Sequence, residues 1–169
     1  VNKIKRWVII CPAIAKQVWA EEIASVLDVP FYLEIVEGKA EERKLLLKEW
    51  KDQPGKLSIV VMNHEATWRL KKFLYKFNPD KVTVDESHKI KNHAAKQSRT
   101  IHTLGKRAAY RCILTGTFLS TPTDAFSQYK FLQPSLFGER WADFLENYVD
   151  KYGFGGHKPK TFKNLEDLN

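Results

Sequence analysis

Five short runs of apolar residues alternate along the chain with longer stretches of mixed polarity. The runs are four to six residues long, are rich in valine, isoleucine or aromatic residues, and span residues 7–11, 31–36, 57–62, 81–84 and 110–114. Runs of this length and composition predict β-strands. Strands that alternate with helices indicate an α/β domain with a mostly parallel sheet, right-handed crossovers and helices on its faces.

Helical spacing is visible between these runs. Residues 16–27 and 40–50 each place apolar side chains on one stripe, which predicts amphipathic helices. A further helix is expected after Thr121 and Pro122, which supply a hydroxyl N-cap and a first-turn proline. We expect the apolar side chains of this helix to pack against the sheet, namely Phe126, Tyr129 and Leu132.

The fourth run ends in two adjacent carboxylates and a histidine, Asp85, Glu86 and His88. In proteins with an open parallel sheet, the ligand-binding residues lie at the carboxyl ends of the strands. Two neighbouring carboxylates repel each other and are costly to bury, so a cation is expected to share the site, and Mg²⁺ with a phosphate ligand is the natural candidate. A strand that ends in a solvated acidic turn has the same local pattern.

The fifth run ends in a hydroxyl, a glycine and a hydroxyl, at Thr115, Gly116 and Thr117. Together the two strand ends resemble motifs II and III of superfamily two helicases and translocases. Residues 85–92, 114–117 and 129–138 resemble, in this order, blocks of the Swi/Snf-type ATPases. Residues 7–12, continuing through Lys16 to residue 23, and residues 59–65 are similar to motifs Ia and Ib of that family.

The chain departs from the family at two points. Phe118 stands where the family has a proline, and the phosphate-binding loop Gly-x-x-x-x-Gly-Lys-Thr is absent from these 169 residues. We therefore interpret residues 1–150 as part of a first RecA-like motor lobe that is truncated at both ends. Residues 151–169, which include a glycine-rich stretch, are interpreted as a linker and the start of the segment toward a second lobe of the same parent chain.

The resemblance implies a role for each motif residue. Asp85 is expected to hold Mg²⁺ through water, with Glu86 beside it as a second candidate metal ligand. Glu86 is expected to orient and deprotonate the water that attacks the γ-phosphate of ATP. His88 is expected to link this site to the two threonines of motif III, whose glycine serves backbone geometry. A surface histidine that caps a turn is the alternative for His88.

Positive charge is concentrated near motif II. Residues 86–111 contain seven lysines and arginines and one acid, a net charge of +6 out of the chain's formal +8. Such a segment favours a polyanion, and with the family resemblance we expect duplex DNA, contacted through its backbone. A solvated basic helix, and structural roles for the motif Ia and Ib residues, are the alternatives. The candidate DNA contacts are Pro12, Lys16, Asn63, Lys89, Lys91, Lys106 and Arg107.

Composition adds limits to this interpretation. With 43% hydrophobic residues, the chain suits one globular domain, and it contains neither a membrane-length apolar run nor a signal peptide. Cys11 and Cys112 lie inside apolar strands and indicate reduced core thiols of an intracellular protein, cytoplasmic or, in a eukaryote, nuclear. The other histidines share no spacing and are interpreted as surface residues: His64, His93, His102 and His157.

The sequence thus indicates the first lobe of a Swi/Snf-like ATP-dependent DNA translocase or helicase that uses ATP and Mg²⁺. The isolated chain is expected to be inactive as an ATPase. A motor subunit of a restriction or repair assembly would share every motif. A non-catalytic DNA-binding or interaction module derived from a motor lobe is the alternative from a different class.

Overall fold

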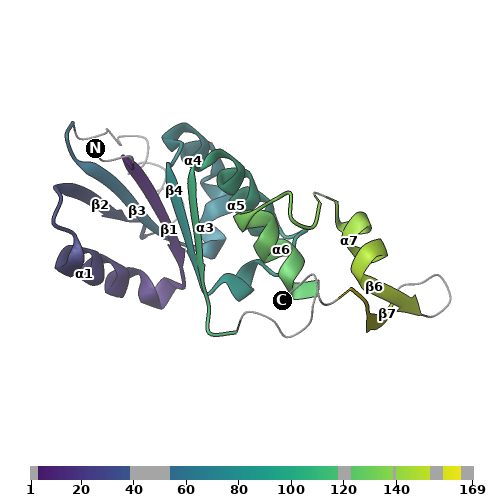
Figure 1. Cartoon of the computed structure of the whole chain (residues 1–169). Helices are drawn as coiled ribbons and strands as arrows, with labels where there is room; N and C mark the ends of the chain where they lie inside the picture. Colours follow the sequence, from purple (N-terminus) through teal and green to yellow (C-terminus); the bar gives the residue numbers. More distant parts are fainter. Residues whose placement is uncertain (1–3, 39–53, 118–122, 139, 153–157, 165–169) are drawn as a thin grey trace.

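A five-stranded sheet forms the centre of the computed structural model, which describes residues 4–38, 54–117, 123–138, 140–152 and 158–164 (Figure 1). The strand order is β2-β3-β1-β4-β5, and all four pairings are parallel. Each strand agrees with its predicted run to within one residue at either end. The strands are β1 (Arg6–Cys11), β2 (Phe31–Ile35), β3 (Leu57–Asn63), β4 (Lys81–Asp85) and β5 (Tyr110–Leu114).

Helices cover both faces of this sheet (Figure 1). Helix α1 (Lys16–Val26) packs on one face, where Ile23 belongs to the same buried cluster as Ile9 and Ile59. The opposite face is covered by α3 (His64–Arg69), α4 (Lys71–Phe77) and α5 (Lys96–Arg107). Central strands that are buried on both faces need apolar residues at consecutive positions, which explains the continuous runs in the sequence. The helix expected over residues 40–50 lies outside the described residues.

Helix α6 (Thr123–Leu132) differs from the expectation in what it buries. Leu132 packs against the main core beside the fully buried Phe131, as expected for a helix on the sheet. Phe126 and Tyr129 instead belong to a separate aromatic cluster with residues of α7 (Trp141–Tyr148). The prediction was wrong for these two residues because α6 lies between two apolar clusters and therefore has apolar side chains on both sides.

A small antiparallel pair follows α7. It consists of β6 (Val149–Tyr152) and β7 (Lys158–Phe162), and Phe162 packs against the aromatic cluster of α6 and α7. The stretch that we interpret as a linker thus includes the end of β6 and all of β7. In the described part of the chain, none of the helices combines the length and the apolarity needed to cross a membrane.

Candidate functional site

The strand register brings the predicted motifs to one edge of the sheet, the edge formed by the carboxyl ends of the strands, which we call the motif edge. Cys11 lies opposite Asn63 in the β1–β3 pairing, and Asp85 lies opposite Leu114 in the β4–β5 pairing. Because these strands are parallel, their carboxyl ends meet at the same edge. The candidate residues that directly end or follow these strands are Pro12, Asn63, Asp85, Glu86, His88, Thr115, Gly116 and Thr117.

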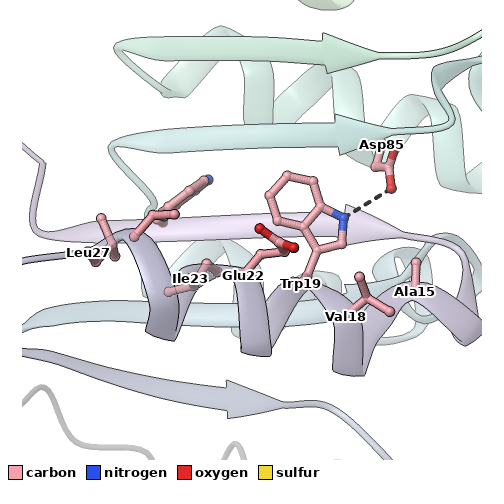
Figure 2. A pocket seen from close by; sticks show the side chains of 9 residues that line it. Ala15, Val18, Trp19, Glu22, Ile23, Leu27 and Asp85 are labelled. Carbon is pink, nitrogen blue, oxygen red and sulfur yellow. Dashed lines mark hydrogen bonds between the residues drawn. The ribbon is translucent and has the colours of Figure 1, made fainter.

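Asp85 is fixed by two donors. Its Oδ1 accepts a hydrogen bond from the backbone N–H of Glu86 at 2.8 Å, and its Oδ2 accepts one from the indole Nε1 of Trp19 at 3.0 Å (Figure 2). A carboxylate has about four acceptor positions, so two bonds leave capacity for further donors. Magnesium commonly keeps several of its waters, and this carboxylate can accept hydrogen bonds from such waters. The donor set therefore fits a hydrated magnesium ion.

Glu86 turns the chain out of β4 in a left-handed backbone conformation, with φ 48° and ψ 54°. This conformation is uncommon for a residue with a side chain, and it is found preferentially where a site requires it. The turn continues into a short 3-10 helix, η2 (Ser87–Ile90), through a bond of 2.9 Å from the Lys89 N–H to the Glu86 carbonyl. The Glu86 side chain stays 41% exposed, and its carboxylate is therefore accessible to water.

The motif II turn is attached to α6 by buried side chains. The hydroxyl of Ser87 donates to Oε1 of Gln128, and the hydroxyl of Ser127 donates to the carbonyl of Ile90. Ser87, Ser127 and Gln128 are all fully buried. Helix α6 is the first described element after motif III, so these bonds connect motif II to the segment that follows motif III. Sequence reasoning missed them; two adjacent polar residues on a buried side of α6 were the available signal.

His64 was expected at the surface, and this prediction was wrong. The residue is 2% exposed, and its Nε2 lies 2.9 Å from the carbonyl oxygen of Asp85. Burial lowers the pKa of His64 below its usual value, although the bond to Asp85 opposes this shift. A neutral ring that donates from Nε2 satisfies the carbonyl directly before Glu86. His64 therefore supports the backbone of motif II.

Motif III has fewer contacts in the described structure. The Thr117 N–H donates to Oγ1 of Thr115 at 3.1 Å. Gly116 has no positive φ, and a Cβ at this position would have no neighbour within 4 Å, so its role in backbone geometry stays a prediction. Nδ1 of His88 lies 3.0 Å from the Glu86 carboxylate. Among the described residues no hydrogen bond joins His88 to either threonine, and its coupling role also stays a prediction.

Lys16, Asn63 and Lys91, all candidate DNA contacts, already bind protein groups. Lys16 is buried, and its ammonium donates to the Val36 carbonyl at 3.1 Å and to Glu37 at 3.0 Å. The amide nitrogen of Asn63 donates to the Glu65 carboxylate at 2.7 Å, whereas its buried Oδ1 has no hydrogen-bond partner in the described part of the chain. Lys91 pairs with a carboxylate of α6 at 2.9 Å.

The remaining cations do not form one group. Lys89 is exposed in η2, close to the strand ends. Lys106 and Arg107 are in the last turn of α5, directly before β5 begins, and so lie toward the opposite edge of the sheet. The guanidinium of Arg107 donates to the Tyr75 carbonyl at 3.0 Å. The structure therefore separates Lys106 and Arg107 from the motif edge.

A cavity of about 380 Å³ opens beside Asp85 (Figure 2). Its wall consists mainly of apolar residues of α1, with Trp7 and Trp19, and its only charged lining residues are Glu22 and Asp85. Phosphate groups need cations or N–H donors, so this cavity does not suit a triphosphate. Across the described ranges there is no cluster of three or more histidine, cysteine, aspartate or glutamate side chains able to hold a metal.

Comparison with known proteins matches nearly the whole chain. A family model described as the SNF2-related domain matches residues 2–168. The "Probable ATP-dependent DNA helicase CHR12" of Arabidopsis thaliana is 30% identical over 133 residues, which cover 78% of this chain and 12% of that protein. The human "DNA annealing helicase and endonuclease ZRANB3" is 27% identical over 172 residues, with 95% and 15% covered. The chain thus spans less than a fifth of the length of either relative.

A solved structure supports the fold. The Sulfolobus solfataricus SWI2/SNF2 ATPase core, determined in complex with double-stranded DNA, superimposes with a TM-score of 0.70 at 23% identity. The match covers 87% of this chain and 29% of that chain. The predicted α/β, RecA-like class is therefore confirmed.

Proposed function

The chain belongs to the SNF2-related domain family, and from this premise we propose that it forms part of the first motor lobe of an ATP-dependent DNA translocase or helicase. The observation that carries the proposal is the carboxylate pair at the end of β4. Asp85 is held in place by two donors, while Glu86 beside it is turned outward and remains accessible to water. One fixed and one accessible carboxylate suit a metal-holding role and a proton-accepting role.

In this proposal Asp85 is the residue that would hold Mg²⁺. The ion supplies charge stabilisation at the phosphates of ATP when it is bound. Glu86 is the general base: it accepts the proton of the attacking water at a carboxylate oxygen, and Nδ1 of His88 lies 3.0 Å from this carboxylate. His64 and Trp19 keep the backbone and carboxylate of Asp85 in position during this step. Thr115 and Thr117 offer hydroxyls at the neighbouring strand end.

DNA is the proposed partner, contacted through its phosphate backbone. The exposed Lys89 and also Asn63, whose amide nitrogen donates to Glu65 in this structure, lie at the motif edge, while Lys106 and Arg107 extend the positive charge along α5. Non-specific association of this kind depends on salt. For Lys16 and Lys91, whose charges are paired within the chain, a DNA contact requires exchange of the present partner.

Replacement of the proposed base tests this function in the full-length protein. Glu86→Gln keeps the size of the side chain but removes its basicity, so ATP hydrolysis should fall by ~10²–10⁴, the usual contribution of a general base. Binding of ATP and of DNA should be retained. Glu21→Gln on the exposed side of α1 removes the same charge and should leave hydrolysis unchanged.

Steady-state hydrolysis and equilibrium binding of both variants decide the matter. Normal hydrolysis by the Glu86→Gln protein would show that this site is not the ATPase base. Hydrolysis absent from the unmodified full-length protein, with DNA binding intact, would favour the non-catalytic module.

A further inference from the structure

A groove lies between α3 and α4 on one side and α5 on the other, on the sheet face opposite α1. Its volume is about 440 Å³. Three cations, Lys71, Lys96 and Arg99, line it together with two aromatic residues, Trp68 and Tyr75, and the remaining lining residues are threonines of α5. No carboxylate is part of this lining. The groove is therefore separate from the motif edge and opposite to it in charge.

The surrounding helices strengthen this positive field. Helices α3, α4 and α5 contain one acid, Glu65, against eight lysines and arginines: Arg69, Lys71, Lys72, Lys76, Lys96, Arg99, Lys106 and Arg107. Lys71, Lys96 and Arg99 are exposed, and within the described ranges none of the three forms an ion pair with a carboxylate. Unneutralised cations that line a concave surface attract a polyanion more strongly than scattered surface charges do.

The aromatic rings of the groove currently contact cations of the protein itself. The Lys96 ammonium lies 4.9 Å from the centre of the Trp68 ring, and the Arg107 guanidinium lies 5.6 Å from the centre of the Tyr75 ring. Such contacts are weak at exposed sites, about 0.5–1 kcal/mol. A nucleobase can replace a lysine on a ring face, and the released ammonium can then bind the phosphate next to that base.

We propose that this groove binds a single-stranded segment of nucleic acid, with a base stacked on Trp68 and phosphates on Lys71, Lys96 and Arg99. Proteins that bind single strands combine a basic groove with aromatic platforms in this way. A duplex has its bases stacked on one another and cannot deliver one to a ring recessed between two helices. The groove contains none of the residues proposed for ATP hydrolysis, so this proposal can be tested independently of that function.

Binding of a fluorescein-labelled oligothymidylate to the 169-residue chain tests the proposal. Single strands release counterions with a slope of about −0.7 per phosphate contact. Three contacts predict a plot of log affinity against log salt with a slope of about −2, and Lys96→Ala with Arg99→Ala should reduce it to about −0.7. Trp68→Leu should weaken binding by about 5- to 150-fold, the worth of one stacked base, and Trp68→Phe should restore most of the affinity.

A charge-matched variant separates the groove from the general positive surface. Lys72→Ala with Lys76→Ala removes two exposed cations of α4 that do not line the groove, and it should change the affinity much less. Circular dichroism and melting temperature verify that all variants are folded. Equal losses in the two double variants would overturn the proposal, as would equally tight binding of a duplex of the same length or an unchanged affinity in Trp68→Leu.

Discussion

Asp85 and Glu86 are adjacent in sequence but are supported from distant parts of the chain. Trp19 bonds to Asp85 from 66 positions away, and Gln128 bonds to Ser87 from 41 positions away. The acidic pair itself could be predicted because both residues follow a recognisable strand. Their supports could not, because a hydrogen bond between residues so far apart leaves no periodic trace in the sequence. The position of Trp19 on the apolar stripe of its helix is that of an ordinary core residue. Only the ability of its indole N–H to donate a hydrogen bond indicates that it could hold Asp85.

The protonation of His102 gives a prediction at the same scale. This residue was expected at the surface but is 5% exposed, and its Nε2 lies 2.9 Å from the carbonyl of Ser127. Burial lowers the pKa of His102 to about 4; the Ser127 bond opposes this shift, and the nearby charges of Lys130, His93 and Lys106 add to it. The ring is therefore neutral in the folded protein at pH 7.

The unfolded chain binds a proton at this histidine near pH 6.5, whereas the folded chain binds it only near pH 4. Stability is therefore fully present above about pH 6.5 and falls as the pH decreases toward 4, by up to about 3 kcal/mol from this group. Urea unfolding at several pH values measures the slope. The His102→Gln protein should show a flatter profile over this window, and an unchanged profile would contradict the assignment.

At the scale of elements, the strands were more predictable than the helices. Residues 57–63 and 81–85 lie in strands buried on both faces, so nearly every position had to be apolar or small. Helix α6 packs against two different clusters, which removes the single stripe that identifies a packing face. Helices α3 and α4 are six and seven residues long, too short for a periodic pattern to appear.

The contact between α5 and α6 depends on a glycine. A Cβ at Gly105 would lie 2.7 Å from the Phe131 ring and 3.0 Å from the Phe131 carbonyl oxygen. Alanine favours a helix over glycine by about 1 kcal/mol, but overpacking of this kind costs about 1–3 kcal/mol. Gly105→Ala should therefore lower the free energy of unfolding by up to about 2 kcal/mol, measured by urea denaturation.

Thr103→Ala, on the exposed side of the same helix, is the matched control for Gly105→Ala. It should change the free energy of unfolding by less than about 0.5 kcal/mol. A Gly105→Ala protein more stable than the parent would mean that α6 can move away from α5 without loss.

At the scale of the whole molecule, the proposed ATPase residues and the basic residues at the end of α5 lie in different places. The proposed ATPase residues lie at the carboxyl ends of the strands, whereas Lys106 and Arg107 lie toward the opposite edge. In the full-length protein, Lys106→Ala with Arg107→Ala should weaken DNA binding and lower DNA-stimulated ATP hydrolysis, with basal hydrolysis nearly unchanged. Removal of two phosphate contacts should reduce the magnitude of the slope of log affinity for duplex DNA against log salt concentration by about 1.8.

Arg140→Ala with Lys163→Ala removes the same charge near α7 and after β7, and it serves as the control for this pair. Its DNA affinity should stay near that of the parent. If both pairs weaken binding equally, net charge rather than the position of Lys106 and Arg107 determines the affinity.

Strand β1 comes before the other described strands in the sequence, yet it lies between β3 and β4 in the sheet. During synthesis, about 70 residues separate the end of β1 from the start of β4, which takes about 4–14 s at 5–20 residues per second. Throughout this interval the apolar run of β1 lacks at least one neighbour, and unpaired apolar strands promote aggregation. The central position of β1 therefore makes the yield of folded chain sensitive to the speed of translation through β3 and β4.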